Sequence, residues 1–363
     1  MLEVKDLVRK HIIRIDPYQS GKPIEEIKRQ LGKKRVIKLA SNENPLGPSP
    51  KALVAIRKNL TAINRYPDAS GFYLKRKLAE TLNVRPQEIV LGNGSDELIE
   101  VIIKTFVEED EHIITADFTF LEYKIISSVK ARTVVTVPLK YFKYDLGAIK
   151  KKINNKTKVI FIANPNNPTG TYVTKYEIED FMRGLPRGLL VVFDEAYDAF
   201  IDVDDFPNSL SYMRNNNCII LKTFSKAYGL AGLRVGYALA RAEFASCMEI
   251  ARQPFNVNSL AQVAAIAALG DKRFMQRTRK LILEGKNYLY EALSKMGLAY
   301  VPSVANFILL DIGKEGVSVF KDMLKYGVII RDMKQYGLKN FIRVTIGTKK
   351  ENERFIRVLK KVL

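Results

Sequence analysis

The chain has 363 residues, enough to bury the cores of one large and one smaller domain, and its 47% hydrophobic content is ordinary for a globular protein. Two cysteines exclude a disulfide framework and a four-cysteine zinc site, and the two histidines, His11 and His112, are too few for most metal sites or a catalytic triad. The formal charge of +20 admits anionic partners, but the lysines are spread along the chain, so we interpret the charge as a background that could attract phosphorylated substrates.

Neither a membrane span nor a secretory signal is expected. No apolar stretch reaches the ~18 residues that cross a bilayer, and the first six residues lack the charged-then-apolar layout of a signal peptide. We therefore expect a cytoplasmic protein. Nucleic-acid binding is a distant alternative that only the charge motivates, because basic clusters such as residues 150–152 lack interleaved aromatic side chains.

The first 35 residues predict an arm with a short helix over Ile24–Leu31, followed by a strand over Val36–Leu39. Prolines forbid regular structure in the loop at residues 41–48. From about residue 86 to 240, apolar runs of strand length alternate with amphipathic segments of helix length, which is typical of a mostly parallel sheet covered by helices on both faces. The candidate strands are Ile89–Leu91, His112–Thr115, Val134–Val137, Val159–Ala163, Leu189–Phe193, Ile219–Leu221 and Val235–Ala240.

A long helical stretch is expected from about residue 258 to 296, and a mixed pattern of strands and helices follows it. Its elements are expected at Asn306–Asp311, Val317–Tyr326, Val328–Arg331, Phe341–Ile346 and Glu351–Leu363. The pattern predicts an α/β fold with a large domain over residues 36–265 and a smaller α+β domain over residues 266–363. Residues 1–35 would be an arm that packs on the small domain or on a partner subunit.

Polar residues follow several of these strands, at the sheet edge where ligands of open α/β sheets bind. Gly92–Glu97 opens a helix, so the backbone of Gly94, Ser95 and Asp96 could hold a phosphate, although such a turn is more often only a turn. Phe118 follows the next strand and could lie against a flat ring, or equally be a core aromatic.

Asp194 and Lys226 each follow an apolar strand and together indicate pyridoxal phosphate. A carboxylate at the end of a buried strand needs a partner, and a protonated pyridine nitrogen is one; an ordinary salt bridge is the alternative. Lys226 lies among small residues between hydroxyls and an arginine, which suits an imine to an aldehyde cofactor that carries a phosphate. Nearby positive charge would lower its pKa, so that it could also act as the general base.

Other side chains could complete this site. Asn167, in the rigid loop Asn164–Gly170, and Tyr197 could donate hydrogen bonds to the ring oxygen. Thr223, Ser225 and Arg234 could bind the cofactor phosphate with hydroxyls and a guanidinium fork. Two further arginines lie in strands between apolar neighbours, which is costly unless each meets an anion; substrate carboxylate or phosphate and ordinary ion pairs both remain open for Arg331 and Arg343.

These residues resemble the pyridoxal-phosphate-dependent aminotransferases of fold type I, class II, and within them the histidinol-phosphate aminotransferases. The resemblance runs over nearly the whole chain. The motifs that carry it, in the order of the family, are 40–48, Arg65-Tyr66-Pro67-Asp68, Gly92–Glu97, Asn164–Gly170, Asp194–Tyr197, Thr223–Gly232 and Arg331-Asp332 through Thr348.

The resemblance implies specific roles for residues of the chain. Lys226, Asp194 and Tyr197 would be catalytic, with Lys226 as the Schiff-base lysine. A partner subunit would contribute Tyr66 to the cofactor phosphate, which makes the active site a property of a homodimer. Tyr18, Asn42, Asn167, Arg331 and Arg343 would bind the substrate. Where relatives commonly have Tyr-x-Pro-Gly, this chain departs from the pattern, with Gln19-Ser20-Gly21 after Tyr18.

The function that the resemblance implies is a step of histidine biosynthesis. The enzyme would transfer an amino group between L-histidinol phosphate with 2-oxoglutarate and imidazole-acetol phosphate with glutamate, by a ping-pong route through a pyridoxamine form of the cofactor. A threonine-phosphate decarboxylase and an aromatic amino-acid aminotransferase are alternatives with the same cofactor site. The orientation of the bonds at the substrate α-carbon distinguishes transamination from decarboxylation, and the sequence leaves it open.

Overall fold

The computed structural model describes residues 4–19, 21–32 and 35–363. Its largest element is a seven-stranded sheet with the order β2-β8-β7-β6-β5-β3-β4. All neighbouring strands in it are parallel except β8, which is antiparallel to both β2 and β7. The strands are β2 (Ile89–Gly92), β3 (His112–Ala116), β4 (Thr133–Val137), β5 (Thr157–Ala163), β6 (Leu190–Asp194), β7 (Cys218–Thr223) and β8 (Gly236–Ala240).

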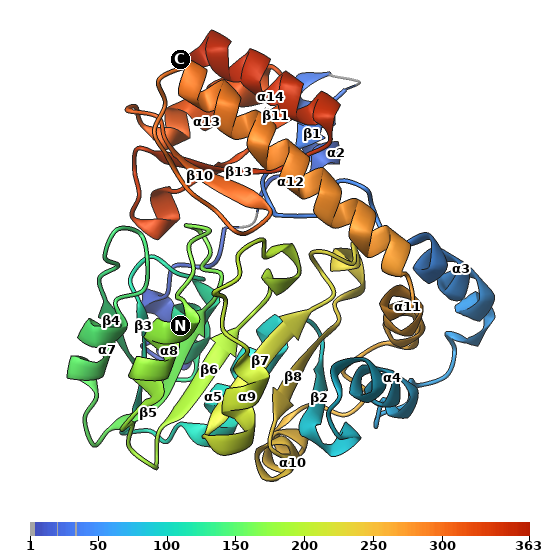
Figure 1. The fold of residues 1–363 in the computed structure, drawn as a ribbon, viewed down its shortest axis with the longest axis vertical. Helices are drawn as coiled ribbons and strands as arrows, with labels where there is room; N and C mark the ends of the chain where they lie inside the picture. Colours follow the sequence, from blue (N-terminus) through green and yellow to red (C-terminus); the bar gives the residue numbers. More distant parts are fainter. Residues whose placement is uncertain (1–3, 20, 33–34) are drawn as a thin grey trace.

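Helices cover both faces of this sheet, with α8 and α9 in front of it and α5 behind it in Figure 1. The central strands β5 and β6 are buried almost throughout, which explains their continuous apolar sequences. The helices packed on the sheet or beside it are α3 (Pro50–Asn59), α4 (Phe72–Leu82), α5 (Ser95–Phe106), α6 (Glu122–Val129), α7 (Leu146–Lys152), α8 (Lys175–Met182), α9 (Ser209–Asn215), α10 (Ala242–Ala251) and α11 (Ser259–Leu269). The expected α/β fold with a large, mostly parallel sheet is confirmed.

The C-terminal part forms a second layer of helices over a four-stranded antiparallel sheet with the order β12-β13-β10-β9. It lies above the large sheet in Figure 1, and α12 runs diagonally from it toward α11. Its hydrophobic core is separate from that of the large sheet. The elements are α12 (Lys272–Lys295), β9 (Tyr300–Val301), β10 (Phe307–Asp311), α13 (Gly316–Lys325), β12 (Arg331–Asp332), β13 (Phe341–Thr345) and α14 (Lys349–Val362).

The N-terminal part contains α1 (Val4–Leu7) and α2 (Ile24–Leu31), then β1 (Ile37–Lys38). Strand β1 pairs in parallel with β11 (Val328–Ile329), so this segment joins the C-terminal elements although the sequence suggested the large domain. The extended chain after the arm meets the free edge of β11, whose backbone groups need partners. The expected domain boundaries at residues 35 and 265 otherwise stay a prediction.

Two expected elements are divided in the structure. The helical stretch at 258–296 ends at Leu269 and restarts at Lys272, because Asp271 caps the new helix by accepting a hydrogen bond from the Phe274 N–H at 3.3 Å. The expected strand Val328–Arg331 becomes β11 and β12, which belong to different sheets. Among the described helices, none is long and apolar enough to cross a membrane.

Candidate active site

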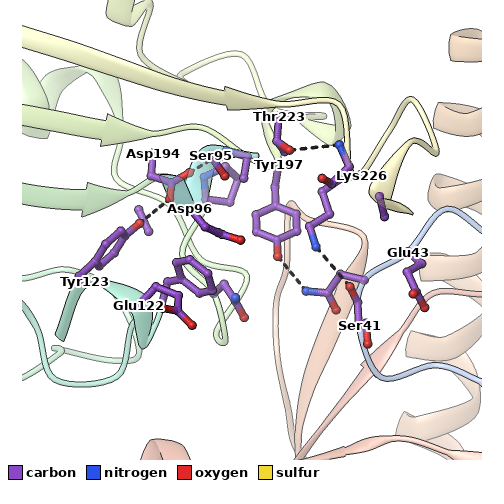
Figure 2. Close-up of a pocket in the computed structure, with 18 of the residues that line it drawn as sticks. Ser41, Glu43, Ser95, Asp96, Glu122, Tyr123, Asp194, Tyr197, Thr223 and Lys226 are labelled. Carbon is purple, nitrogen blue, oxygen red and sulfur yellow. Dashed lines mark hydrogen bonds between the residues drawn. The ribbon is translucent and has the colours of Figure 1, made fainter. Parts of the chain in front are cut away.

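A cavity of about 330 Å³ opens at the carboxyl ends of β5, β6 and β7, facing the C-terminal sheet. It brings together residues that are far apart in the sequence, including Lys226 and Asp194. Figure 2 shows Asp194 beside Tyr123 on one side and Lys226 beside Ser41 on the other, with Tyr197 between them. The lining residues are Tyr18, Ser41, Asn42, Glu43, Ser95, Asp96, Phe120, Glu122, Tyr123, Ala163, Pro165, Asn167, Asp194, Ala196, Tyr197, Thr223, Ser225, Lys226, Ala231, Arg234 and Arg343.

Asp194 ends β6 as a buried carboxylate. Its Oδ2 accepts a hydrogen bond from the Tyr123 hydroxyl at 2.6 Å, and its Oδ1 accepts one from the Ala196 N–H at 3.1 Å. Among the described residues, no cationic side chain pairs with it. Burial has the larger effect and raises the pKa of this carboxyl to about 6, while the two hydrogen bonds partly oppose that rise. A carboxylate without a cation is ready to pair with a protonated ring nitrogen.

Lys226 follows β7 and reaches into the same cavity. Its Nζ donates to the Ser41 carbonyl at 3.2 Å and lies 5.7 Å from the centroid of the Tyr197 ring. Burial and the nearby guanidinium of Arg343 lower the pKa of this amine to about 8. The amine is therefore unprotonated near neutral pH far more often than an ordinary lysine, as a nucleophilic amine requires.

Lys222, four residues earlier, shows why the two lysines differ. Its Nζ forms an ion pair with Glu195 at 2.7 Å and another with Asp198. Burial by itself would lower the pKa of Lys222, but the two carboxylates raise it by more than that, so the pKa lies well above its ordinary value. Lys222 therefore stays charged in a structural cluster, whereas Lys226 is the lysine that lines the cavity.

The N-terminus of α5 and Arg234 form a cradle suited to a phosphate. Gly94, before the first turn, has φ +82, which favours glycine, and a Cβ there would lie 2.4 Å from an Arg234 nitrogen and would displace that guanidinium. Gly94 provides no side-chain cap, which leaves N–H groups of the first turn available to an anion. The Arg234 guanidinium donates to Asp96 at 2.9 Å and lies 3.5 Å from the Ser225 hydroxyl.

Arg343 is a buried guanidinium with polar but uncharged partners. It donates to the Asn167 side-chain oxygen and, at 2.8 Å, to the Ala40 carbonyl, while its Nε has no partner. No carboxylate pairs with it in the part of the chain that the structure describes. Because the Asn167 oxygen is occupied, the amide NH₂ of Asn167 is left to donate into the cavity.

Arg331 lies opposite Arg343 in the β12–β13 pair and is 7% exposed. Its guanidinium is 5.3 Å from the centroid of the Tyr18 ring, which lines the cavity. Arg331 is therefore behind Tyr18 and does not itself line the cavity. The structure nevertheless brings Tyr18, Arg331 and Arg343 to the same end of the site, and their binding of substrate stays a prediction.

A family model for aminotransferases of class I and II matches residues 34–359. The chain belongs to this family. Its relatives include a histidinol-phosphate aminotransferase of Moorella thermoacetica, 46% identical over 98% of this chain and 92% of that protein. One of Anaeromyxobacter is 44% identical over 98% of this chain and 99% of its own length.

The fold also matches solved aminotransferase structures. The crystal structure of histidinol-phosphate aminotransferase from Sinorhizobium meliloti in complex with pyridoxal-5'-phosphate superposes with a TM-score of 0.89 at 29% identity. The match covers 97% of this chain and 96% of the other. The protein is thus an aminotransferase of fold type I.

Sequence reasoning placed one aromatic residue of this aminotransferase wrongly and missed two others. Phe118 lies outside the cavity, where its ring meets Gly337, and its N–H bonds to the Asp117 side chain. Phe120 and Tyr123 line the cavity instead, because the chain turns after β3 and α6 begins only at Glu122. The aromatic pattern after the strand was visible, but the turn that decides which ring faces the ligand was not.

Tyr66 also lies outside the cavity of its own chain. It is 83% exposed and stacks on Phe255 with ring centroids 4.7 Å apart. Asn42 lines the cavity, and both ends of its side-chain amide are hydrogen-bonded to the protein, the nitrogen to Tyr197 and the oxygen to Thr345.

Proposed function

We propose that this aminotransferase is a histidinol-phosphate aminotransferase that uses pyridoxal phosphate. It would move an amino group between L-histidinol phosphate and 2-oxoglutarate, with imidazole-acetol phosphate and glutamate as products. The observation that carries the proposal is the meeting of Lys226 and the cation-free Asp194 in one cavity. The 46% identity to a histidinol-phosphate aminotransferase supports the choice of substrate.

The cavity has a suitable group for each part of the cofactor. When bound, pyridoxal phosphate supplies an aldehyde carbon that accepts the amine nitrogen and a ring that withdraws electrons from the substrate. We assign the ring nitrogen to Asp194 and the ring oxygen to Asn167 and Tyr197. The phosphate is assigned to the first turn of α5, with Thr223 and Ser225 beside Arg234.

Lys226 has two assigned tasks in this scheme. As an unprotonated amine it captures the cofactor, and once released by the substrate it carries a proton to and from the substrate α-carbon. A pKa of about 8 allows both tasks near neutral pH, since a general base works best when its pKa is close to the working pH.

The anionic groups of both substrates are assigned to the arginine end of the cavity. Arg343 is buried and has no carboxylate partner among the described residues, so a carboxylate or phosphate would balance its charge. Arg331 and Tyr18 border the same end. One site could thus accept the phosphate of histidinol phosphate and the distal carboxylate of glutamate in turn.

We further propose that the enzyme is a homodimer whose subunits each give Tyr66 to the other's cofactor phosphate. The exposed position of Tyr66, outside its own cavity, supports this assignment. We propose the cytoplasm as its location, because moving a charged phosphate into an apolar bilayer costs a large free energy, so phosphorylated substrates stay in the compartment where they are made.

A half-reaction tests the substrate. Cofactor-loaded protein mixed with histidinol phosphate alone should convert the cofactor to its pyridoxamine form, and 2-oxoglutarate should reverse the change. Lys226→Ala should slow both half-reactions by about a thousandfold or more. Conversion by tyrosine but not by histidinol phosphate would instead indicate an aromatic amino-acid aminotransferase, and release of carbon dioxide from threonine phosphate would indicate the decarboxylase.

A further inference from the structure

Asn42 has a backbone conformation that glycine would adopt more easily. Its φ is +55, in the left-handed region, and the residue is 1% exposed. Asparagine tolerates this region better than most residues, but a side chain there still carries a cost. The hydrogen bonds that hold Asn42 in this conformation must therefore offset that cost.

Three hydrogen bonds hold Asn42 to the C-terminal sheet. The Thr345 hydroxyl accepts from the Asn42 N–H at 2.9 Å and donates to Asn42 Oδ1 at 3.2 Å. The Asn306 side chain donates to the Asn42 carbonyl at 3.0 Å. Because Thr345 receives the backbone hydrogen, its own hydrogen is free for Oδ1, and this fixes the oxygen end of the amide toward Thr345.

The nitrogen end of the amide then faces Tyr197. Asn42 Nδ2 donates to the Tyr197 hydroxyl at 2.9 Å, the contact drawn as a dashed line from Tyr197 in Figure 2. No described residue accepts the hydrogen of that hydroxyl. Since its oxygen already receives a hydrogen bond, the Tyr197 hydroxyl is arranged to donate its hydrogen to a ligand in the cavity.

We propose that Asn42 is a positioning residue that aims and strengthens the hydrogen bond from Tyr197 to the ring oxygen of the cofactor. The inference rests on the function proposed above and departs from the expectation that Asn42 binds the substrate, because both ends of its amide are engaged by the protein. A phenol that accepts a hydrogen bond is a better donor, since hydrogen bonds in a chain polarise one another.

The acidity of Tyr197 agrees with this role. Burial raises the pKa of its hydroxyl to about 12, while Arg343 and the hydrogen bond from Asn42 lower it. A stronger donor draws electron density from the ring oxygen of the cofactor. That oxygen then holds less tightly the proton it shares with the nitrogen of Lys226, so this proton leaves at a lower pH.

Asn42→Gly tests the proposal. Glycine suits φ +55 and keeps both backbone hydrogen bonds while removing the amide. In cofactor-loaded protein, the pH midpoint of the cofactor's absorption change should rise by about 0.4–1 pH unit, the equivalent of one hydrogen bond. Asn42→Asp, which keeps the shape, turns the donor into an acceptor and adds a negative charge, is the second variant and should raise the midpoint by more than Asn42→Gly.

A double variant separates this role from a merely structural one. If Asn42 acts through Tyr197, adding Asn42→Gly to Tyr197→Phe should leave the midpoint of Tyr197→Phe unchanged. Thr345→Ser keeps the hydroxyl and serves as the control. Its midpoint should equal that of the unmodified protein. An unchanged midpoint in Asn42→Gly, or an equal rise in the Tyr197→Phe background, overturns the inference. The proposed function fails separately, if the unmodified protein acquires no cofactor absorption or no half-reaction.

Discussion

At the scale of single residues, the site depends on charges that are buried without their usual partners. Asp194 has no cation and Arg343 has no carboxylate among the described residues. Such groups weaken the fold of the cofactor-free protein, because their desolvation is not offset by an opposite charge. Both would be neutralised by ligands, which ties ligand binding to stability.

The first prediction concerns Asp194→Asn. The carboxyl pKa is about 6 in the folded protein and 3.8 as a free group, so the folded state binds this proton more tightly. The contribution of Asp194 to the free energy of unfolding is therefore most favourable below pH 3.8 and is lost as the pH rises through 6. Asparagine is uncharged, so its burial carries no cost from an unpaired charge, and the Tyr123 hydroxyl can rotate to accept a hydrogen bond from its amide.

We expect cofactor-free Asp194→Asn protein to be more stable than the unmodified protein at pH 7.5, by on the order of 2 kcal/mol. The difference should shrink as the pH falls toward 4, and the variant should retain the cofactor less well. Urea unfolding at several pH values measures the first effect, and cofactor release on dialysis measures the second. Equal stability at pH 7.5 would contradict the buried, unpaired state of this carboxylate.

At the scale of elements, a glutamine in the turn Lys334–Tyr336, between β12 and β13, binds the N-terminal arm. The side chain of Gln335 donates to the Pro17 carbonyl at 2.9 Å and accepts from the Gln19 N–H at 3.2 Å. These bonds bracket Tyr18, whose ring covers Arg331. The glutamine thus supports the arm on both sides of Tyr18.

Gln335→Met should release the arm while keeping the length of the side chain. Because the two exposed hydrogen bonds to the arm and the 3.5 Å bond from the Arg331 guanidinium to Gln335 are lost, we expect the KM for the phosphorylated substrate to rise about three- to tenfold, with little change in kcat. Gln276→Met, which changes an exposed glutamine on α12, is the matched control. Steady-state kinetics measures both variants, and a fall in kcat with an unchanged KM would show that the arm does not position the substrate.

At the scale of the whole molecule, two hydrophobic cores meet along the cavity, and a further apolar surface is left exposed. Exposed large side chains follow one another between residues 60 and 73, including Ile63, Tyr66, Phe72 and Tyr73. A surface of this kind is typical of an interface with another chain. It agrees with the proposed dimer, in which Tyr66 would leave its own subunit's surface for the partner's site.

Subunit mixing tests the exchange of Tyr66. Lys226→Ala and Tyr66→Ala proteins should each be nearly inactive alone. In a hybrid dimer, one site would carry both changes and the other neither, so mixing by joint refolding should restore about a quarter of the unmodified activity. Native mass spectrometry checks that hybrids form. Hybrids without restored activity would show that Tyr66 serves its own subunit or none.

Much of the site could be predicted from the sequence because its parts follow buried strands. The apolar runs before Gly92, Asp194 and Lys226 set where each strand ends, and parallel strands end at a common edge. Arg343 could be predicted for a similar reason, as a charge inside an apolar strand. In these cases the residue type and its immediate neighbours were sufficient.

Other features depended on contacts between distant segments. A turn between β3 and α6 decides whether Phe118 or Phe120 lines the cavity. The expected strand Val328–Arg331 is divided because its two halves pair with the edges of two different sheets. The bond between Asn42 and Tyr197 joins residues 155 positions apart. The sequence alone determined the order of strands, helices and polar strand ends along the chain, because these follow from local backbone preferences and periodic burial. Only the tertiary structure decided which side chains meet across the cavity, because that depends on how two separately formed cores pack.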